Sequence, residues 1–423
     1  MRDLLPEEEW YYAEIFRVAR AIAEWYGFQA IATPHLEHTA LFEASLGEAT
    51  DIVEKQMYSF RSRGGDALTL RPEGTAPAMR AYLEHGMLSN PQPVKLFYSG
   101  AFFRHENPQA GRAREFYQTG LEMIGDAEPI NDALVMRVFS LITRELGVPV
   151  TIALNSIGDR ECRPAYRKEL VAYYRRHISR LCVDCKRRLK INPLRLLDCK
   201  EEECQAIRAR APKMIDRLCE PCRRHFEEVK EFLDAVHLPY EIDFHLVRGL
   251  DYYTRTVFEI FAALPEENIP RALAIGSGGR YDDLAKIIGS SRPVPAVGGA
   301  MGVDRIAHCM QTKKSEDARF IKKETPAVFL IQLGQTAKKK LLHWIEELRH
   351  AGIPVAHVFS RDSLKAQLKL ADRMGTPWAV IVGQKEALNE TVIIRNMQSG
   401  EQEIASLSKL VLRLKEKLKK DKR

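Results

Sequence analysis

The stretch "LVRGLDYYTRTVFE", residues 246–259, places a cation, a flexible backbone position and two phenol rings within a few residues. In an extended strand, side chains alternate, so Tyr253 and Arg255 would share one face and Tyr252 would lie on the other. Gly249 lets another group approach the backbone closely. Arginine holds carboxylate and phosphate oxygens through a planar fork. The stretch therefore indicates a pocket for an anionic ligand beside a flat ring.

A second group of arginines surrounds a polar loop in "FFRHENPQAGRAREFYQTGLE", residues 102–122. Arg104 precedes the loop, Arg112 and Arg114 end it, and Phe116 comes two residues later. Arginines in a polar loop are more often surface charge, but this loop joins two predicted strands. Guanidinium groups grip phosphate oxygens, and an aromatic ring can stack on a nucleobase. The pattern favours a nucleotide site.

Polar side chains also interrupt apolar segments. Gln118 and Glu122 are polar residues in an otherwise apolar predicted strand. In "TLRPEGTA", Glu73 and Thr75 fall at a strand-to-helix junction, where a carboxylate and a hydroxyl can meet an ammonium group. A helix N-cap by Thr75 is the simpler interpretation, and this segment alone favours it.

Glycines gather in two later segments. "AIGSGGRYDDL" offers Gly276, Gly278 and Gly279 for close backbone approach to a ligand, or equally for a β-bulge. "VGGAMGVDRIAHC" places Arg305 in the first turns of a helix after a glycine-rich strand. Neither segment alone specifies a chemistry.

Most of the 8 cysteines lie in one basic region with short apolar runs, residues 157–231. It contains two C-x-x-C pairs, Cys182 with Cys185 and Cys219 with Cys222. Two residues between thiolates let both bind one ion, so we expect the two pairs to form a tetrahedral zinc site. The 33 residues between the pairs exceed the usual spacing, and Cys199 and Cys204 form a rival pair. The alternative is a set of reduced thiols in a small core.

The composition is that of a folded protein of two or three domains. The chain has 423 residues, of which 45% are hydrophobic and 29% charged. No run has the length of a membrane span, and the first residues, "MRDLLPEEEW", contain no apolar signal core. We therefore expect a cytoplasmic protein whose cysteines are thiols or metal ligands.

The net charge of +7 is unevenly distributed. The tail from Lys409 to Arg423 holds 8 Lys/Arg against 2 Asp/Glu, and residues 180–224 hold 13 against 7. The rest of the chain is slightly negative. Concentrated basic patches suit a polyanion such as RNA, although a solvated helix face explains the tail equally well.

Hydrophobic periodicity predicts the elements that position these residues. Residues 7–26 are predicted to form an amphipathic helix with Trp10, Ile15, Val18, Ile22 and Trp25 on its apolar face. Residues 55–76 indicate a hairpin that turns at Gly64 and Gly65 and leads into a helix at Thr75. Hairpins joined by helices, without regular strand-helix alternation, favour a mostly antiparallel sheet flanked by helices.

The end of the chain has a different pattern. The charged segment "QTKKSEDARFIKKET" indicates a linker. Beyond it, strands and helices alternate regularly, which predicts a separate small α/β domain with a parallel sheet. The fold class is therefore α/β, with an α+β first domain, an inserted module and a terminal α/β domain.

Taken together, these segments resemble the histidyl-tRNA synthetase family of class II aminoacyl-tRNA synthetases. "GFQAIATPHLEHTALF" resembles class motif 1, "FFRHENPQAGRAREFYQ" motif 2 and "GGAMGVDRI" motif 3. "LVRGLDYYTRTVFE" and "GSGGRYDDL" resemble two stretches peculiar to the histidine enzymes. The resemblance implies a catalytic domain at 1–156 and 232–316, a cysteine-rich insertion at 157–231 and an anticodon-binding domain at 326–423.

The resemblance also implies roles for single residues. Arg248 and Arg104 would be catalytic and hold the α-phosphate from two sides, while Arg305 and Phe116 would enclose the adenine. Glu122 and Tyr253 would bind the imidazole nitrogens. The implied histidine site comprises Glu73, Gly74, Thr75, Arg104, Gln118, Glu122, Arg248, Tyr252 and Tyr253. The implied ATP site comprises Arg104, Arg112, Phe116 and Arg305.

The activity that the resemblance implies is ligation of histidine to tRNA(His) through a histidyl adenylate, with ATP as substrate and Mg²⁺ bridging the departing pyrophosphate. A homodimer is implied by the motif 1 helix and Pro34. One alternative is a non-catalytic, histidine-sensing relative that regulates histidine biosynthesis. Another is a different class II synthetase with a similar terminal domain, which "RGLDYY" disfavours.

Overall fold

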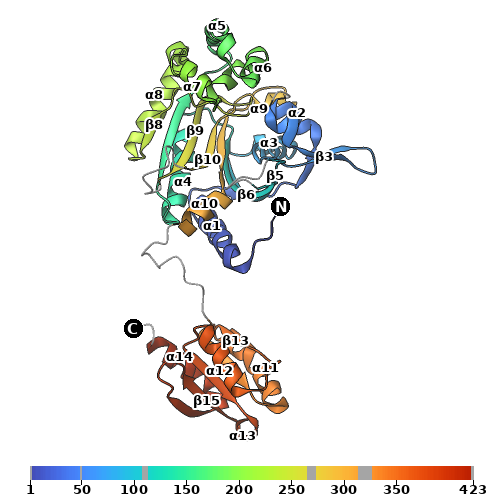
Figure 1. The fold of residues 1–423 in the computed structure, drawn as a ribbon, viewed down its shortest axis with the longest axis vertical. Helices are drawn as coiled ribbons and strands as arrows, with labels where there is room; N and C mark the ends of the chain where they lie inside the picture. The colour runs from blue at the N-terminus through green and yellow to red at the C-terminus, as the bar shows by residue number, and fades with distance from the viewer. Residues whose placement is uncertain (1, 48–49, 107–112, 264–272, 313–325, 421–423) are drawn as a thin grey trace. The chain divides into compact units, whose positions relative to one another are not determined.

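The computed structural model describes residues 2–47, 50–106, 113–263, 273–312 and 326–420. The chain divides into two compact units, residues 1–314 and 315–423, and each is described here by itself (Figure 1). Among the described residues, no helix is long and apolar enough to cross a membrane. Most of the predicted charged linker lies outside the described residues.

An eight-stranded sheet forms the centre of the first unit. Its strands in spatial order are β1 (Gln29–Ala30), β5 (Val94–Phe103), β6 (Glu115–Ile124), β11 (Ala296–Gly302), β10 (Ala274–Arg280), β9 (Thr254–Ala262), β7 (Val150–Ser156) and β8 (Tyr240–Ile242). The pairs at the two edges, β1 with β5 and β7 with β8, are parallel, and all other pairs are antiparallel. The predicted antiparallel sheet flanked by helices is confirmed.

Helices cover both faces of this sheet. One face packs against α1 (Pro6–Trp25), α4 (Ile130–Glu145), α10 (Val303–Thr312) and part of α8 (Glu220–Ala235). The other face packs against α2 (Thr39–Leu46), α3 (Thr75–Glu84) and α9 (Leu284–Ile287). Short helical turns at Ile52–Gln56 and Met87–Ser89 complete this side.

The predicted apolar face of α1 needs one correction. The stripe that faces the sheet contains Tyr12, Ile15, Ala19 and Ala23, all buried. Trp25 falls outside this stripe at the last position of the helix, and it is 86% exposed. Its assignment to the core face was therefore wrong.

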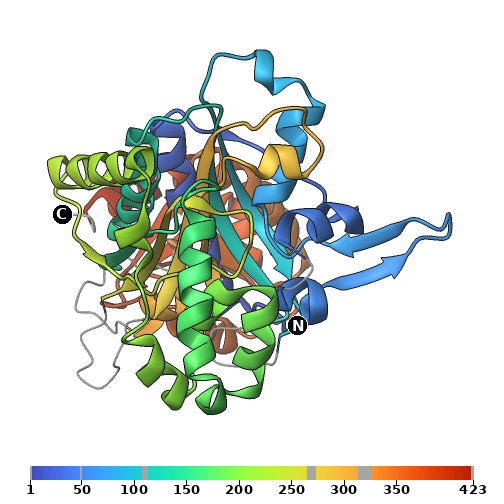
Figure 2. The same ribbon diagram turned by 90° about the horizontal axis from the view of Figure 1, so that it is seen from above.

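A small three-stranded sheet joins β2 (Leu36–His38), β4 (Ala67–Leu70) and β3 (Tyr58–Arg61). The predicted β3–β4 hairpin is confirmed and projects from the unit (Figure 2). Gly65 in its turn has φ +94°, a conformation that favours glycine. Helix α3 begins at Thr75, as the sequence predicts.

The cysteine-rich region is helical and lies at one end of the first unit (Figure 1). It consists of α5 (Arg163–Arg176), α6 (Val183–Ile191), α7 (Glu202–Arg208) and the start of α8, with short turns at Ile178–Arg180, Pro193–Asp198 and Met214–Arg217. Its core contains Tyr166, Leu170 and Tyr174 together with several cysteines. Further along α8, Phe226 and Leu233 pack into the main core, so the chain returns to the sheet within this helix.

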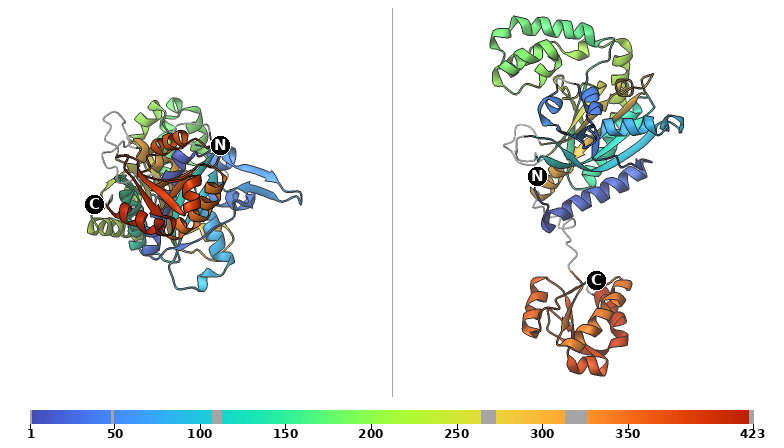
Figure 3. Two further views of the ribbon diagram at one scale, coloured as in Figure 1. Left: turned by 90° about the horizontal axis from the view of Figure 1, so that it is seen from below. Right: turned by 90° about the vertical axis from the view of Figure 1, so that its right-hand side faces the viewer.

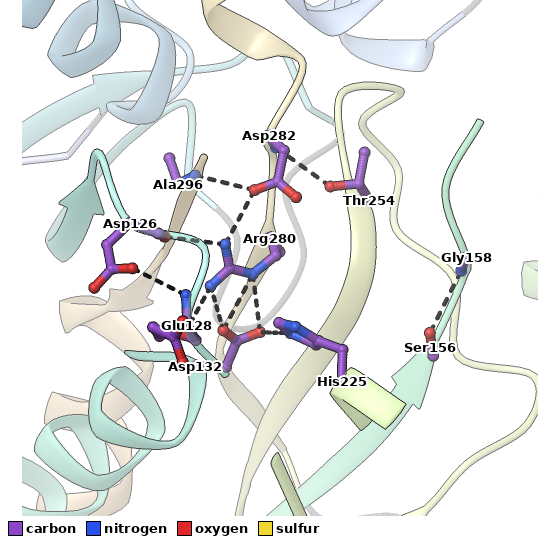
Figure 4. A network of polar contacts seen from close by, with 10 residues as sticks. All are labelled: Asp126, Glu128, Asp132, Ser156, Gly158, His225, Thr254, Arg280, Asp282 and Ala296. Atoms are coloured by element: carbon purple, nitrogen blue, oxygen red, sulfur yellow. Dashed lines mark hydrogen bonds and ion pairs between the residues drawn. The ribbon is translucent and has the colours of Figure 1, made fainter. Parts of the chain in front are cut away.

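A buried ion pair ties three elements of the main core together. Arg280 of β10 and Asp132 of α4 are both fully buried, and their closest oxygen and nitrogen lie 2.7 Å apart (Figure 4). His225 of α8 contacts the same carboxylate at 3.2 Å, and Arg280 also pairs with Asp282 at 3.1 Å. The neighbouring Arg280 guanidinium lowers the pKa of Asp132 against the effect of burial. Removing one partner would leave a buried charge unpaired.

The second unit contains a five-stranded sheet in the order β13 (Val355–His357), β12 (Val328–Gln332), β14 (Trp378–Val382), β15 (Thr391–Asn396) and β16 (Gln402–Ser406). The first three strands are parallel, as predicted, whereas β15 and β16 add antiparallel pairs that the alternation pattern did not indicate. Helices lie on both faces (Figure 3). They are α11 (Gln335–His350), α12 (Leu364–Arg373), α13 (Gln384–Asn389) and α14 (Leu410–Lys420), with a short turn at Leu407–Lys409.

Candidate active site

A cleft opens on the first unit between β5, β6, β10, β11 and the segment that precedes β9. It encloses about 1020 Å³ of empty space, counting the solvent at its mouth. Most of the expected site residues line it: Glu73, Gly74, Thr75, Arg104, Phe116, Gln118, Arg248, Tyr252, Tyr253 and Arg305. Residues separated by more than two hundred positions thus meet in one cleft.

The segment 243–253, called the pre-β9 loop below, is not a strand. Both Tyr252 and Tyr253 line the cleft, and their ring centroids lie 4.6 Å apart. The expected alternation of these residues was therefore wrong, because β9 begins only at Thr254. Arg255 has φ +49°, and the register with β10 shifts beside it, so a bulge turns the chain here.

Three arginines, called the cationic wall below, line the cleft. Arg248 donates to Ser277, lies 3.7 Å from a carboxylate oxygen of Glu259, and has a buried Nε that lacks a hydrogen-bond partner among the described residues. Arg104 donates to the carbonyl of Pro72 at 2.8 Å. The third, Arg305, lies in the first turn of α10, as predicted. Side chains held in this way are preorganised cations for an anionic ligand.

The cleft also carries buried acids, called the acidic wall below: Glu73 lines it, and Glu122 lies behind. The Glu73 carboxylate accepts from the backbone N–H groups of Thr75 at 2.7 Å and Ala76 at 2.9 Å. It therefore caps α3, and the simpler interpretation of Thr75 as the N-cap was wrong. Thr75 instead donates its hydroxyl to Glu122 at 2.8 Å. Burial raises the pKa of Glu73.

Glu122 lies beneath the cleft and does not line it. Its side chain is fully buried and accepts hydrogen bonds from the hydroxyls of Thr75, Tyr98 and Tyr281. Burial raises its pKa to about 8, and the hydrogen bonds from Tyr281 and Thr75 oppose this rise. A pKa near 8 favours the protonated form of this group in the folded protein at neutral pH.

Glycines let the Tyr98 ring pass between strand and helix. A Cβ added at Gly74 would come within 2.4 Å of that ring, and one added at Gly120 would come within 2.2 Å of it.

The predicted bulge near Gly276 and Gly279 is also present, since the register of β10 with β9 shifts at both places. A Cβ at Gly278 would lie 2.2 Å from the carbonyl oxygen of Gly298, so this glycine permits close strand packing.

The polar loop is only partly described. Arg112 lies outside the described residues, and Arg114 is not among the residues that line the cleft. Phe116 lines it and packs against Arg104, whose guanidinium carbon lies 5.3 Å from the ring centroid. Gln118 also lines it, and its buried carbonyl oxygen has no hydrogen-bond partner among the described residues.

Sequence patterns did not indicate every residue of the site. Tyr98, Ser277 and Glu259 line the cleft as well, and Tyr281 bonds to Glu122. A tyrosine inside an apolar strand such as "VKLFYSGAFF" has the same pattern as a core residue. In "GGRYDD", Tyr281 is followed by two aspartates, and these polar neighbours were the available sign that it is not an ordinary core residue.

The cysteines form two clusters, and the expected four-cysteine set is divided between them. Cys182 and Cys185 join Cys199 and Cys204, all four ligand atoms lying within 4.8 Å of one another. Cys219 and Cys222 belong instead to a cluster with Asp159 and Cys162. Helix packing divides the expected set. The start of α6 carries Cys182 and Cys185 beside Cys199 and Cys204, whereas Cys219 and Cys222 lie at the start of α8.

An antiparallel sheet that carries such a cleft, followed by an α/β unit, is the arrangement of a class II aminoacyl-tRNA synthetase. A family model described as histidyl-tRNA synthetase matches residues 1–306, and one described as anticodon binding domain matches residues 327–417. The chain belongs to the histidyl-tRNA synthetase family.

Curated relatives extend over the whole chain. A protein of Dehalococcoides mccartyi named histidine--tRNA ligase is 45% identical over 98% of both chains. A protein of the same name from Pelotomaculum thermopropionicum is 44% identical over 98% of this chain and 96% of its own. The sequence-based assignment to this family is confirmed.

Solved structures agree with this assignment. The apo histidyl-tRNA synthetase of S. aureus is 32% identical, with a TM-score of 0.80 over 98% of both chains. A Bacillus halodurans C structure described as an ATP phosphoribosyltransferase regulatory subunit/histidyl-tRNA synthetase is 20% identical, with a TM-score of 0.62 over 90% of this chain and 97% of its own. The second likeness shows the fold alone.

Proposed function

We propose that this protein joins L-histidine to tRNA(His) in two steps, with the cleft of the first unit as the active site. The observation that carries the proposal is that cationic and acidic side chains line the same cleft. Arg104, Arg248 and Arg305 line it together with Glu73. An amino acid has a carboxylate at one end of its backbone and an ammonium at the other, so it can pair with the arginines and with Glu73 at the same time.

The first step forms the adenylate. A carboxylate oxygen of histidine attacks the α-phosphorus of ATP, and the bond from that phosphorus to the pyrophosphate breaks. Arg248 and Arg104 stabilise the negative charge that develops on the α-phosphate from two sides. Arg305 and Phe116 hold the adenine, while Arg112 binds the terminal phosphates. In the second step, a terminal ribose hydroxyl of tRNA attacks the histidyl carbonyl carbon, and AMP departs.

Magnesium fits this chemistry because carboxylates line the cleft beside the arginines. Glu106 and Glu259 offer the oxygen donors that Mg²⁺ prefers. When bound with ATP, the ion neutralises charge on the phosphates. The protein side chains orient the two reactants and exclude water from them.

The histidine side chain is recognised next to the pre-β9 loop. Tyr252 and Tyr253 present rings and hydroxyls to the imidazole, with Glu122 and its hydrogen-bonded network behind. Glu73, Thr75 and Gln118 bind the ammonium, and Gly74 leaves room at the same wall. An analogue without the ring nitrogens leaves buried polar partners unpaired, which gives strong discrimination.

Zinc in the cysteine-rich region is proposed at a revised set of ligands: Cys182, Cys185, Cys199 and Cys204. Tetrahedral zinc with sulfur ligands at about 2.3 Å requires sulfur atoms roughly 3.8 Å apart. The sulfurs of Cys182 and Cys199 lie 3.9 Å apart. Backbone N–H groups of Cys185 and Cys182 also point at cluster sulfurs, each at 3.4 Å.

A homodimer in the cytoplasm is the proposed assembly and location. The segment that resembles motif 1 leaves Leu36 exposed, and Trp25 just before it is also exposed. Apolar side chains of this size on a surface suit contact with a second copy. Sedimentation analysis that gives the mass of a single chain would contradict the dimer.

Histidine-dependent exchange of pyrophosphate into ATP tests the catalytic proposal. The full-length protein should catalyse it with histidine and not with other amino acids. A protein that binds histidine without exchange would match the alternative of a non-catalytic, histidine-sensing regulator. The Arg248 and Arg104 side chains in the cleft favour catalysis over that alternative.

The second unit is proposed to bind the anticodon region of the tRNA. Deleting residues 326–423 should reduce tRNA charging by at least about tenfold more than exchange, because loss of phosphate contacts weakens nucleic-acid binding strongly. The two rates are measured on the same preparation. Equal losses of both activities would contradict separate roles for the two units.

A further inference from the structure

A second cluster of metal-type ligands lies where the cysteine-rich region joins the catalytic sheet. Asp159, Cys162, Cys219 and Cys222, called the neck cluster below, bring one ligand atom each to within 4.8 Å of one another. Cys162 and Cys222 are buried, and the other two are half-buried. Three thiols and a carboxylate in this arrangement suit zinc in its usual fourfold coordination.

We propose that the neck cluster binds a second zinc ion, and that this ion positions the pre-β9 loop for histidine binding. The positioning part rests on the proposed function, whereas the metal site does not. The site is separate from the four-cysteine cluster, which shares no ligand with it.

The distances in the neck cluster match those of a zinc site. With sulfur at about 2.3 Å and oxygen at about 2.1 Å from a tetrahedral ion, a sulfur and an oxygen lie roughly 3.6 Å apart. The same carboxylate oxygen of Asp159 lies 3.5 Å from the sulfur of Cys162 and 3.8 Å from the sulfur of Cys219. The remaining ligand atoms lie within 4.8 Å of one another, so small side-chain adjustments bring all four to one ion.

The surrounding backbone favours negatively charged sulfur. The N–H of Asp159 points at the sulfur of Cys162 at 3.3 Å. Cys162 stands at the N-cap of α5 and Cys219 at the N-cap of α8. Helix N-termini carry partial positive charge, which stabilises the thiolate that a metal requires.

The neck cluster also joins the two ends of the cysteine-rich region. Asp159 and Cys162 lie where the chain leaves β7, and Cys219 and Cys222 lie where it returns along α8. Asp159 and Cys219 are 60 positions apart. An ion at this place closes the whole region like a crosslink, which restricts the chain most in its unfolded state.

From the neck cluster, short contacts lead to the cleft. The second carboxylate oxygen of Asp159 lies 3.6 Å from the Arg255 guanidinium. The Arg255 N–H donates to the carbonyl of Gly158 at 2.8 Å. One residue after Cys162, Arg163 donates to the carbonyl of Tyr253 at 2.5 Å. The turn that carries two of the ligands thus holds the end of the pre-β9 loop.

Gly158 lets this turn close. It has φ +64°, and a Cβ there would lie 2.6 Å from the sulfur of Cys162 and 2.3 Å from a side-chain carbon of Met214. Figure 4 shows its N–H directed at the hydroxyl of Ser156, at 3.4 Å. Any larger residue would displace a metal ligand.

Metal analysis tests the site. Full-length protein purified without chelator, or reduced and incubated with Zn²⁺, should contain about two zinc ions per chain. Cys222→Ser should contain about one, and Cys185→Ser in the other cluster should also contain about one. Cys309→Ser is the matched control, because Cys309 lies in α10 outside both clusters, and it should keep about two.

Two substitutions of Cys219 guard against misfolding as the cause of metal loss. Cys219→Ser removes a ligand and should lose one ion, whereas Cys219→His supplies a nitrogen ligand and should retain it. A wild-type content of one ion or less would overturn the site. So would an unchanged content in Cys222→Ser, or a disulfide among the neck cysteines.

The positioning role has its own measurement. Cys222→Ser should raise the KM for histidine about tenfold, as loss of a supporting contact around a site typically does. Asp159→Cys should keep the ion yet raise the same KM, because it removes the carboxylate that holds Arg255. A lost ion with an unchanged KM would overturn the positioning role. A wild-type protein without histidine-dependent exchange would instead refute the proposed function and leave the metal counts untouched.

Discussion

The cationic wall and the acidic wall of the cleft bury their charges to different depths. The side chains of Arg104 and Arg248 are 22% and 18% exposed, whereas Glu73 is 5% exposed and Glu122 is fully buried. A guanidinium can keep its charge when partly buried, because its pKa is far above neutral. A buried carboxyl without a cation becomes neutral instead.

This difference determines how each wall works. The cationic wall is charged before any ligand arrives, so it can attract and orient phosphate. In the acidic wall, Glu73 accepts hydrogen bonds from backbone N–H groups, and Glu122 accepts them from hydroxyl groups. An arriving ammonium would pair with the Glu73 carboxyl group, so this wall recognises its ligand by pairing with it.

The largest expected effect comes from the cationic wall. Arg248→Ala should reduce histidine-dependent pyrophosphate exchange by on the order of a hundredfold or more, because a fixed cation beside the α-phosphate is lost. Arg248→Lys should restore little activity, since lysine lacks the planar fork. Arg20→Ala, which removes an exposed arginine of α1, is the control. Activity of Arg248→Ala within a few-fold of wild type would contradict the assignment.

The cationic wall was also the easier one to predict from the sequence. Arg104 and Arg248 stand out as charges beside aromatic residues, Arg305 was assigned through the family resemblance, and the structure brings all three to one cleft. The β3–β4 hairpin was confirmed for a similar reason, because its pattern is local in the chain.

Features that depend on distant packing were not predictable. Tyr98 has the sequence pattern of a core residue, and only its place between Gly74 and Gly120 reveals its contact with Glu122. Tyr252 and Tyr253 lie in the loop before β9, so the alternation expected of a strand did not apply to them. The cysteine pairs were grouped by spacing along the chain, but helix packing decides which sulfurs meet.

A smaller effect is expected on the acidic wall. Glu73→Gln should raise the KM for histidine by about tenfold to a hundredfold, because a charge-assisted hydrogen bond to the ammonium is lost. The amide oxygen of glutamine can still cap α3, so stability should change less than in Glu73→Ala. Steady-state exchange kinetics at varied histidine and at varied ATP would measure both constants. A KM for ATP that rises as much as that for histidine would argue against an ammonium site, and Glu84→Gln on the exposed end of α3 is the control.

A third effect, on stability and not on activity, concerns the buried member of the acidic wall. The pKa of Glu122 is raised from 4.5 to about 8, mainly by burial. Between these values the folded protein holds a proton that the unfolded chain releases, so this group's contribution to stability falls as the pH rises toward 8. Each unit of pKa corresponds to about 1.4 kcal/mol, which gives a loss of a few kcal/mol across the window.

Glu122→Gln removes this titration, so the free energy of unfolding of the variant should depend less on pH between about 5 and 8 than that of wild type. Denaturant unfolding at several pH values measures the free energy of unfolding of both proteins. Subtracting the wild-type value from that of the variant cancels the contributions of groups elsewhere in the chain. Glu9→Gln on the exposed face of α1 should leave the wild-type slope unchanged. Parallel curves for Glu122→Gln and wild type would mean that Glu122 is ionised in the folded protein. The hydroxyls of Thr75, Tyr98 and Tyr281 would then stabilise a carboxylate. The acidic wall, like the cationic wall, would carry its charge in the folded protein before a ligand binds.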